Sequence, residues 1–324
     1  MITDNIMTQI KRLIIIDGHA VLHRAFHALP PLTTQKGEQV NAIYGFLLVF
    51  FKALNEFRPD FAVATFDLPA PTFRHQEFKE YKAKRPKMAD ELAEQIPKIK
   101  NILTAFSVPI FEKEGFEADD LIGALSRQAE QEQVETVIIS GDLDVLQLVG
   151  PATKVFALRK GVKDTVLYDE EKVKEKYDGL LPSQLLDYKA LRGDPSDNIP
   201  GAAGIGEKTA LTLIKDFDNI ENIYEVIERQ LDGAEKITPA VKEKLIASKE
   251  LVFLSKRLVT IRKDAPVDLD LTQCRWGDYN FEKAEKALGD FEFYSLIKKI
   301  PAPPGAERAK QEEEKPKPSN LKLF

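Results

Sequence analysis

The fold is decided by the stretch Val134-Glu135-Thr136-Val137-Ile138-Ile139-Ser140-Gly141-Asp142-Leu143-Asp144. Its apolar, β-branched part is typical of a strand buried on both faces of a parallel sheet. It ends in a glycine and two carboxylates, and ligands of open α/β sheets bind beyond the carboxyl ends of the strands. The stretch therefore predicts either a functional site at that edge or a simple polar turn.

Two other apolar stretches end in the same way. Residues 12–18 predict a strand that ends at Asp17, and residues 61–67 predict one that ends at Asp67. Three more carboxylates open the helix expected over residues 121–131: Glu117, Asp119 and Asp120. Capping a helix needs one or two acids, not three. This surplus of negative charge favours a site for a hard cation with oxygen ligands.

Composition limits the class of protein. The chain has 324 residues, 43% of them hydrophobic, and a net charge of −6. The single cysteine excludes an internal disulfide framework and a thiolate zinc cluster. Neither a signal peptide nor a membrane span is predicted, since the longest apolar run covers only residues 46–51. We expect a cytoplasmic protein. Its net charge argues against a simple basic nucleic-acid binder, but not against one whose basic groups are clustered beside an acidic metal pocket.

Two regions suggest contacts with phosphate. After the strand at residues 12–17, Arg24 lies among His19, His23 and His27, which share a helical face and form either a zinc row or packing and phosphate-facing groups. In residues 73–87, basic residues alternate with aromatics. That composition suits a surface that grips phosphates and stacks bases, or else a solvated charged helix.

A third region combines acids with a glycine hairpin. Asp194 and Asp197 precede Gly204-Ile205-Gly206, which opens an amphipathic helix containing Lys208 and Thr209. Exposed backbone N–H groups at a helix N-terminus bind phosphate without reading base sequence. The combination predicts a phosphate-binding element next to two further acids.

Over about residues 12–297, these motifs closely resemble the 5′ nuclease (flap endonuclease-like) domain found at the N-terminus of bacterial DNA polymerase I. The resemblance implies an α/β fold of the PIN/5′ nuclease type, with a central, mainly parallel sheet flanked by helices. It implies a nuclease domain over residues 1–190 with a helical arch at about 72–106, and a helix-hairpin-helix region over 191–300. The Pro- and Glu-rich residues 301–324 are expected to be a disordered tail.

The resemblance also implies roles for individual residues. Five acids fall near a first divalent ion, Mg²⁺ or Mn²⁺: Asp17, Asp67, Glu117, Asp119 and Asp142. Four fall near a second: Asp120, Asp144, Asp194 and Asp197. The arch would present Tyr81, Lys82 and Arg85 to the scissile phosphate and a terminal base, with Arg74 at its base. The hairpin from Gly204 would hold duplex DNA, in this family often with a monovalent cation such as K⁺. Ala202-Ala203 replaces the Val-Pro pair common in the family.

The expected function is therefore a monomeric, two-metal 5′-3′ exonuclease and flap endonuclease of replication and repair, acting on 5′ flaps, nicks and RNA primers on DNA. The alternatives are a catalytically silent DNA-structure binder and a small-molecule phosphatase. The sequence leaves open the metal used, the balance of the two activities, and whether the chain stands alone. The final Asn-Leu-Lys-Leu-Phe suggests either a linker or a sliding-clamp peptide that binds through Leu321, Leu323 and Phe324.

Overall fold

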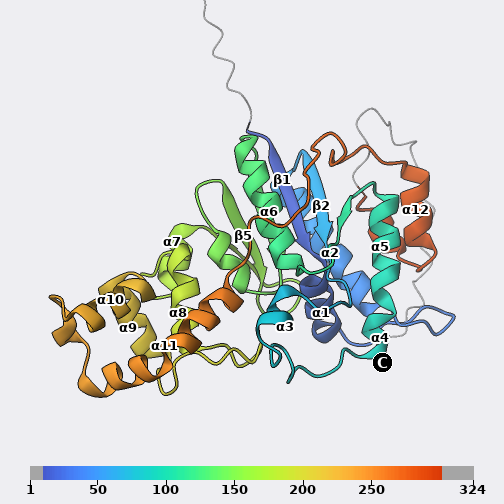
Figure 1. Cartoon of the computed structure of the whole chain (residues 1–324). Coiled ribbons are helices and arrows are strands. Elements are labelled where there is room, and N and C mark those ends of the chain that lie inside the picture. Colours follow the sequence, from blue (N-terminus) through green and yellow to red (C-terminus); the bar gives the residue numbers. More distant parts are fainter. Residues whose placement is uncertain (1–9, 301–324) are drawn as a thin grey trace, which may run out of the picture.

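The computed structural model describes residues 10–300, so the predicted tail and clamp peptide lie outside the described residues. The centre is one sheet of six strands in the order β3-β2-β1-β4-β5-β6 (Figure 1). All neighbouring strands are parallel except β5 and β6, which form an antiparallel pair. The strands are β1 (Arg12–Asp17), β2 (Phe61–Thr65), β3 (Ile110–Phe111), β4 (Glu135–Ser140), β5 (Thr153–Leu158) and β6 (Thr165–Tyr168). The expected α/β fold with a mainly parallel sheet is confirmed.

The strand order places a switch point at the middle of the sheet. From β1 the chain builds outward through β2 and β3, and then crosses to β4 on the other side of β1. In such sheets the loops after the two central strands diverge and leave a crevice at their carboxyl ends. Asp17 ends β1, and Asp142 follows β4 by two residues. The fold therefore brings these two strand-end acids to the same edge.

Helices cover both faces of the sheet. Along β1, Leu13 and Ile15 pack into the core beneath α6, while Ile14 and Ile16 face the opposite core. This alternation on a fully buried strand is what a two-sided parallel sheet requires. The helices of this body are α1 (Gly18–Ala28), α2 (Asn41–Phe57), α3 (Phe73–Glu77), α4 (Asp90–Ala93), α5 (Gln95–Ala105), α6 (Ala118–Gln131) and α7 (Glu170–Lys176).

A second, helical region lies to one side of the sheet (Figure 1). It contains α8 (Leu185–Arg192), α9 (Glu207–Phe217), α10 (Ile220–Arg229) and α11 (Pro239–Val259). After α11 the chain returns along α6 to the sheet, where Cys274 O accepts a hydrogen bond of 2.9 Å from Ala62 N. The last helices, α12 (Phe281–Gly289) and α13 (Tyr294–Ile297), join the core of the sheet body.

The segment between α3 and α4 differs from the expected helical arch. Residues 78–89 form turns and irregular chain, and Lys82 has a φ of 55°. The prediction of a helical arch is therefore wrong for residues 78–89, which include Tyr81, Lys82 and Arg85. No helix within residues 10–300 is both long and apolar enough to cross a bilayer.

Candidate active site

A chain of hydrogen bonds fixes the acids at the ends of β1 and β4. Asp17 caps α1 by accepting from Ala20 N at 3.0 Å, and its other oxygen accepts from the Ser140 hydroxyl at 2.6 Å. Ser140 Oγ also accepts from Asp142 N at 2.9 Å, and Asp142 Oδ1 accepts from Asp144 N at 2.9 Å. Ser140 therefore holds the acids of two strands in a common arrangement.

Gly141 allows this close approach between the two loops. A Cβ at Gly141 would lie 2.7 Å from Ala20 O, inside van der Waals contact, so a larger residue would push β4 and α1 apart. The carbonyl of Gly141 accepts a hydrogen bond of 3.1 Å from Arg24 Nη2. Arg24, predicted as a phosphate contact, thus braces the acidic loop in this structure and is only half-buried.

Asp67 and Asp119 complete a group of four carboxylates. Asp67 Oδ1 accepts from Ala118 N at 2.7 Å, which places it over the first turn of α6, where Asp119 lies. Asp67 N donates to His19 Nδ1 at 3.0 Å, so that nitrogen is an acceptor. Burial lowers the pKa of His19, so its ring is neutral here.

The four carboxylates, Asp17, Asp67, Asp119 and Asp142, repel one another when they are ionised, and either protonation or a bound cation relieves that repulsion. Burial raises the pKa of Asp17 to about 7, and repulsion from Asp67 and Asp142 adds to the effect. Burial likewise raises the pKa of Asp119 well above its usual range, and the other three acids add to it. Among the described residues, no lysine or arginine forms an ion pair with any of these four carboxylates; His19 Nδ1 lies 3.6 Å from Asp67 Oδ2, but it accepts from Asp67 N and is uncharged.

These four side chains suit a hydrated divalent ion better than a dehydrated one. No three or more His, Cys, Asp or Glu side chains between residues 10 and 300 are arranged to hold a metal as they stand. Mg²⁺ keeps several waters and needs only one or two direct carboxylates. A bound cation would relieve the mutual repulsion of the carboxylates and lower the raised pKa values of Asp17 and Asp119.

A second pair of acids shares a lysine. Lys189 Nζ donates to Asp194 Oδ2 at 2.8 Å and also to Asp144 Oδ1. The two pKa values move in opposite directions although the partner is the same. Burial and the neighbouring Asp142 raise the pKa of Asp144 to about 7. Burial opposes ionisation of Asp194 as well, but Lys189 and two hydrogen bonds from Ser196 lower its pKa to about 2.

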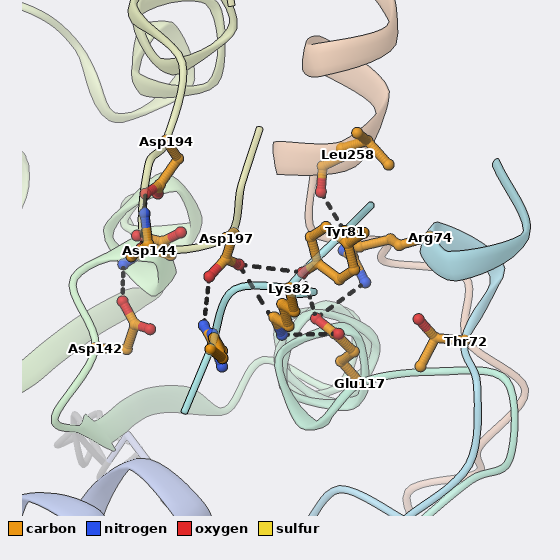
Figure 2. Close-up of polar contacts among 12 residues, drawn as sticks. Thr72, Arg74, Tyr81, Lys82, Glu117, Asp142, Asp144, Asp194, Asp197 and Leu258 are labelled. Carbon is orange, nitrogen blue, oxygen red and sulfur yellow. Dashed lines mark hydrogen bonds and ion pairs between the residues drawn. The ribbon is translucent and has the colours of Figure 1, made fainter. Parts of the chain in front are cut away.

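The remaining pair, Glu117 and Asp197, holds the basic-aromatic segment (Figure 2). Tyr81 Oη lies 3.0 Å from Glu117 Oε2 and 3.2 Å from Asp197 Oδ2, and Lys82 Nζ donates to Glu117 Oε1 at 2.8 Å. Arg85 forms an ion pair with Asp197. Burial, followed by the two carboxylates, raises the pKa of Tyr81 far above its usual range, so the phenol stays a donor.

Tyr81 is not available for base stacking in this arrangement. Its side chain is 3% exposed and packs with Ile199, Leu258 and Val259. The prediction that Tyr81 stacks on a terminal base is therefore inconsistent with the structure, because the ring has no free face here. The sequence showed an aromatic among basic residues, but it could not show that the ring is buried.

The geometry also argues against the roles predicted for Asp120 and Arg74. Asp120 is fully buried and accepts two hydrogen bonds from Arg74, at 2.7 and 2.8 Å, with two more from Glu117 N and Arg262 N. Arg74 is 2% exposed and also donates to Leu258 O and Thr260 O. With these bonds in place neither side chain can reach a metal or DNA, and the pair ties α3, α6 and the end of α11 together.

The glycine hairpin lies between α8 and α9, as predicted. Gly206 precedes α9, whose first turn has no side-chain cap, and Gly204 has a φ of 76°. Lys208 is exposed and Thr209 half-buried, while Ile205 is buried in the core. Gly204 O accepts from Lys244 Nζ at 3.1 Å.

Two serines of α11 hold this hairpin in place. Gly201 N donates to Ser255 Oγ at 3.0 Å, and Ala203 N donates to Ser248 Oγ at 3.3 Å. Both serines are buried. These bonds constrain the backbone at Ala202-Ala203.

Comparison with known proteins agrees with this architecture. The family model for the 5′-3′ exonuclease N-terminal resolvase-like domain matches residues 12–178, and the model for the 5′-3′ exonuclease C-terminal SAM fold matches residues 180–282. The chain is 38% identical to a 5′-3′ exonuclease of Aquifex aeolicus, over 90% of this chain and 95% of that protein. The chain belongs to the 5′-3′ exonuclease family.

Further relatives place this family member in context. It is 42% identical to DNA polymerase I of Bacillus subtilis over 91% of its own length, but spans only 33% of that protein. Its fold is similar to that of the bacteriophage T5 D15 flap endonuclease, solved as a pseudo-enzyme-product complex with DNA and metal ions. The TM-score is 0.61 at 22% identity, over 89% of this chain and 97% of the phage chain.

Two site residues of this exonuclease-family chain were missed from the sequence. Ser140 connects Asp17 to Asp142, and its signal was a small polar residue at the end of an otherwise apolar strand. Lys189 pairs with Asp144 and Asp194, and no local pattern marks it because Asp144 lies 45 residues away in the chain.

Proposed function

We propose that this chain is a metal-dependent 5′ nuclease that hydrolyses phosphodiester bonds of structured DNA: 5′ flaps, nicks and RNA primers paired to DNA. The observation that supports it most is the group of four mutually repelling carboxylates at the switch point of the sheet. When ionised, such a group is unfavourable unless positive charge is bound there. A small-molecule phosphatase would also use it, but would have no use for a phosphate-binding hairpin beside it.

The acids divide into two proposed ligand groups. Asp17, Asp67, Asp119 and Asp142 would hold the first ion, with Glu117 at its border, and Asp144, Asp194 and Asp197 would hold the second. When bound, a pair of divalent cations such as Mg²⁺ or Mn²⁺ activates water and stabilises the leaving oxygen. The protein's own contribution is to fix the carboxylates through Ser140 and the α1 and α6 caps, so that little reorganisation is needed.

Lys82 and Arg85 are proposed to stabilise charge on the scissile phosphate. In this structure they pair with Glu117 and Asp197, so their positive charges already lie beside the proposed ligands. The Lys82 side chain is 22% exposed and that of Arg85 is 47% exposed, which leaves both accessible to an incoming phosphate. Tyr81 is proposed to position Glu117 and Asp197 through its hydroxyl.

Recognition is proposed to depend on DNA structure more than on base sequence. The uncapped first turn of α9 offers backbone N–H groups, and Lys208 adds an exposed charge. Such groups contact the phosphate backbone and carry no base information. A monovalent ion at this hairpin would compete with Lys244, which already binds Gly204 O. The clamp peptide at the C-terminus remains a prediction.

The deciding experiment is cleavage of a 5′-flap duplex labelled at the flap, with Mg²⁺ or EDTA, beside a single-stranded control. We expect short 5′ products only with flap and metal together. The double change Asp142→Asn and Asp144→Asn should slow cleavage at least ~1000-fold, about 4 kcal/mol of transition-state stabilisation, and leave flap binding intact.

A matched control is Asp216→Asn with Asp232→Asn, two exposed acids of the helical region. This pair removes the same charge and should leave the rate unchanged. Tight flap binding by the unaltered protein without cleavage under any divalent ion would reject the nuclease and favour the silent DNA-structure binder. Full cleavage by the Asp142/Asp144 variant would reject the proposed ligand groups.

A further inference from the structure

Lys189 is a largely buried cation between two acids of the site. Its ammonium bridges Asp144, beyond the end of β4, and Asp194, in the hairpin loop after α8. Only 15% of the Lys189 side chain is exposed. Figure 2 shows Asp144 between Asp142 and Asp194, and the Lys189 ammonium bonds to Asp144 and Asp194.

The two halves of the site are thus neutralised differently. Asp17, Asp119 and Asp142 have no ion pair among the described residues, whereas Asp144 and Asp194 share one ammonium. An ammonium is a compact charge with three donors, so it can satisfy two carboxylates at once. A divalent ion bound to the same two oxygens would lie within a few ångströms of that charge, where like charges repel strongly.

The helix that carries Lys189 cannot easily withdraw it. Its neighbours Tyr188 and Ala190 are buried, and the Lys189 carbonyl accepts from Gly193 N at 2.8 Å at the end of α8. Leu191 O accepts from Ala202 N at 2.8 Å, so α8 is also bonded to the glycine hairpin. Only the flexible side chain of Lys189 is free to move, and it must leave the carboxylates if a cation replaces it.

We propose that Lys189 is a built-in cation of the second ion site, which a divalent ion must displace. This inference rests on the proposed nuclease function. Lys189 keeps Asp144 and Asp194 paired in the metal-free protein and weakens binding of the second ion relative to the first. The first ion site, at Asp17, Asp67, Asp119 and Asp142, has no such competitor. Occupancy of the second site is therefore set by Lys189 as well as by the acids.

The test is direct binding of Ca²⁺ and Mn²⁺, by calorimetry and by Mn²⁺ paramagnetic resonance, without DNA or turnover. We expect two classes of site in the unaltered protein. Lys189→Met should tighten the weaker class ~10-fold or more and leave the tighter class unchanged. Lys189→Arg, which keeps the charge, should stay close to the unaltered protein. Lys215→Met removes a lysine that pairs with Asp178 away from the site and serves as the matched control.

A measurement on the unaltered protein covers the case in which Lys189→Met does not fold. Reductive methylation of Lys189, followed by mass spectrometry, should speed up as Mn²⁺ fills the weaker site, while methylation of Lys215 stays constant. Weaker-site affinity that is unchanged or lower in Lys189→Met, or methylation that ignores Mn²⁺, would overturn the inference but leave the nuclease proposal standing. If the unaltered protein binds no divalent ion at all, both proposals fail.

Discussion

Asp17 belongs to the acidic site, but its burial makes the fold less stable when its carboxyl group is ionised. It is 3% exposed and ends a fully buried strand, yet it caps α1 and anchors Ser140. Burial raises its pKa to about 7. A carboxyl group whose pKa is higher in the folded than in the unfolded protein stabilises the fold at low pH, and that stabilisation is lost as pH rises.

This predicts how the stability of the metal-free protein depends on pH. Between the unfolded pKa near 3.8 and the folded pKa of about 7, the folded protein binds the extra proton, so the free energy of unfolding falls as pH rises through that window. The loss is on the order of 4 kcal/mol for an isolated group. Mg²⁺ should restore stability at pH 8. Urea unfolding in EDTA and in Mg²⁺, at pH 5 and pH 8, measures both effects.

The control for this prediction is Asp17→Asn, which keeps a good helix cap but cannot ionise. His19 and His23 have pKa values lowered by burial, and they favour the opposite trend below pH 6.5. Because they are common to both proteins, the difference between the unaltered protein and Asp17→Asn reports Asp17 together with the repulsion that it exerts on Asp119. A difference that does not change with pH would contradict the assigned pKa.

At this scale the sequence predicted the residues that stand at strand ends and missed those defined by distant partners. Asp17, Asp67 and Asp142 follow apolar strands, so local pattern sufficed to bring them to one edge. In sequence, Asp120 looks the same as Asp119. In the structure it forms an ion pair with Arg74, 46 residues away, and this ion pair occupies its carboxylate. Only the folded chain distinguishes the two neighbours.

At the scale of the element, residues 78–85 show tertiary contacts overriding local spacing. The spacing of Tyr81 and Arg85 suits a helix, but Lys82 N donates to Asp197 O at 2.9 Å, and Asn198 Nδ2 donates to Glu80 O at 2.7 Å. Backbone groups that pair with another loop are not available for helical bonds. The positive φ of Lys82 also interrupts the helical backbone conformation. The intrinsic helix propensity of these residues is too weak to outweigh such contacts.

The glycine hairpin yields a prediction at the same scale. Ser255 is fully buried, and its hydroxyl accepts from Gly201 N. Ser255→Ala leaves that N–H without its partner, which costs about 1–3 kcal/mol, and loosens the hairpin relative to α11. We expect lower stability and several-fold weaker binding to nicked duplex DNA, measured by thermal unfolding and fluorescence anisotropy.

Ser126→Ala is the matched control for Ser255→Ala. Ser126 is also a buried helical serine, but its hydroxyl donates within α6 to Ile122 O at 2.7 Å, away from the hairpin. Its removal leaves no donor unpaired, so DNA binding should be unchanged. Equal losses of binding in both variants would show that the Ser255 effect is general destabilisation and not hairpin geometry.

At the scale of the whole molecule, the C-terminal part of the described chain closes the sheet body. Trp276 N donates to Asp60 O at 2.8 Å, and the indole lies against Phe50 and Phe106, with ring centroids 5.3 and 6.1 Å apart. The chain segments before and after the helical region therefore both pack on the sheet body. The resemblance implied a helix-hairpin-helix region over residues 191–300, and nothing local in residues 275–300 shows which core an aromatic residue joins.

Trp276 is the only tryptophan in the chain, so its fluorescence reports whether this segment is docked. Since the segment packs into the core shared by β1, α2 and α5, we expect its fluorescence transition in urea to coincide with loss of helix by circular dichroism. Trp276→Ala should lower the free energy of unfolding by ~2 kcal/mol, less than for a fully buried tryptophan because the side chain is half-buried. Tyr294→Ala, at a residue 59% exposed, should change it by less than ~0.5 kcal/mol. A fluorescence transition that precedes the dichroism, with little cost for Trp276→Ala, would mean that the segment undocks on its own and does not stabilise the sheet body.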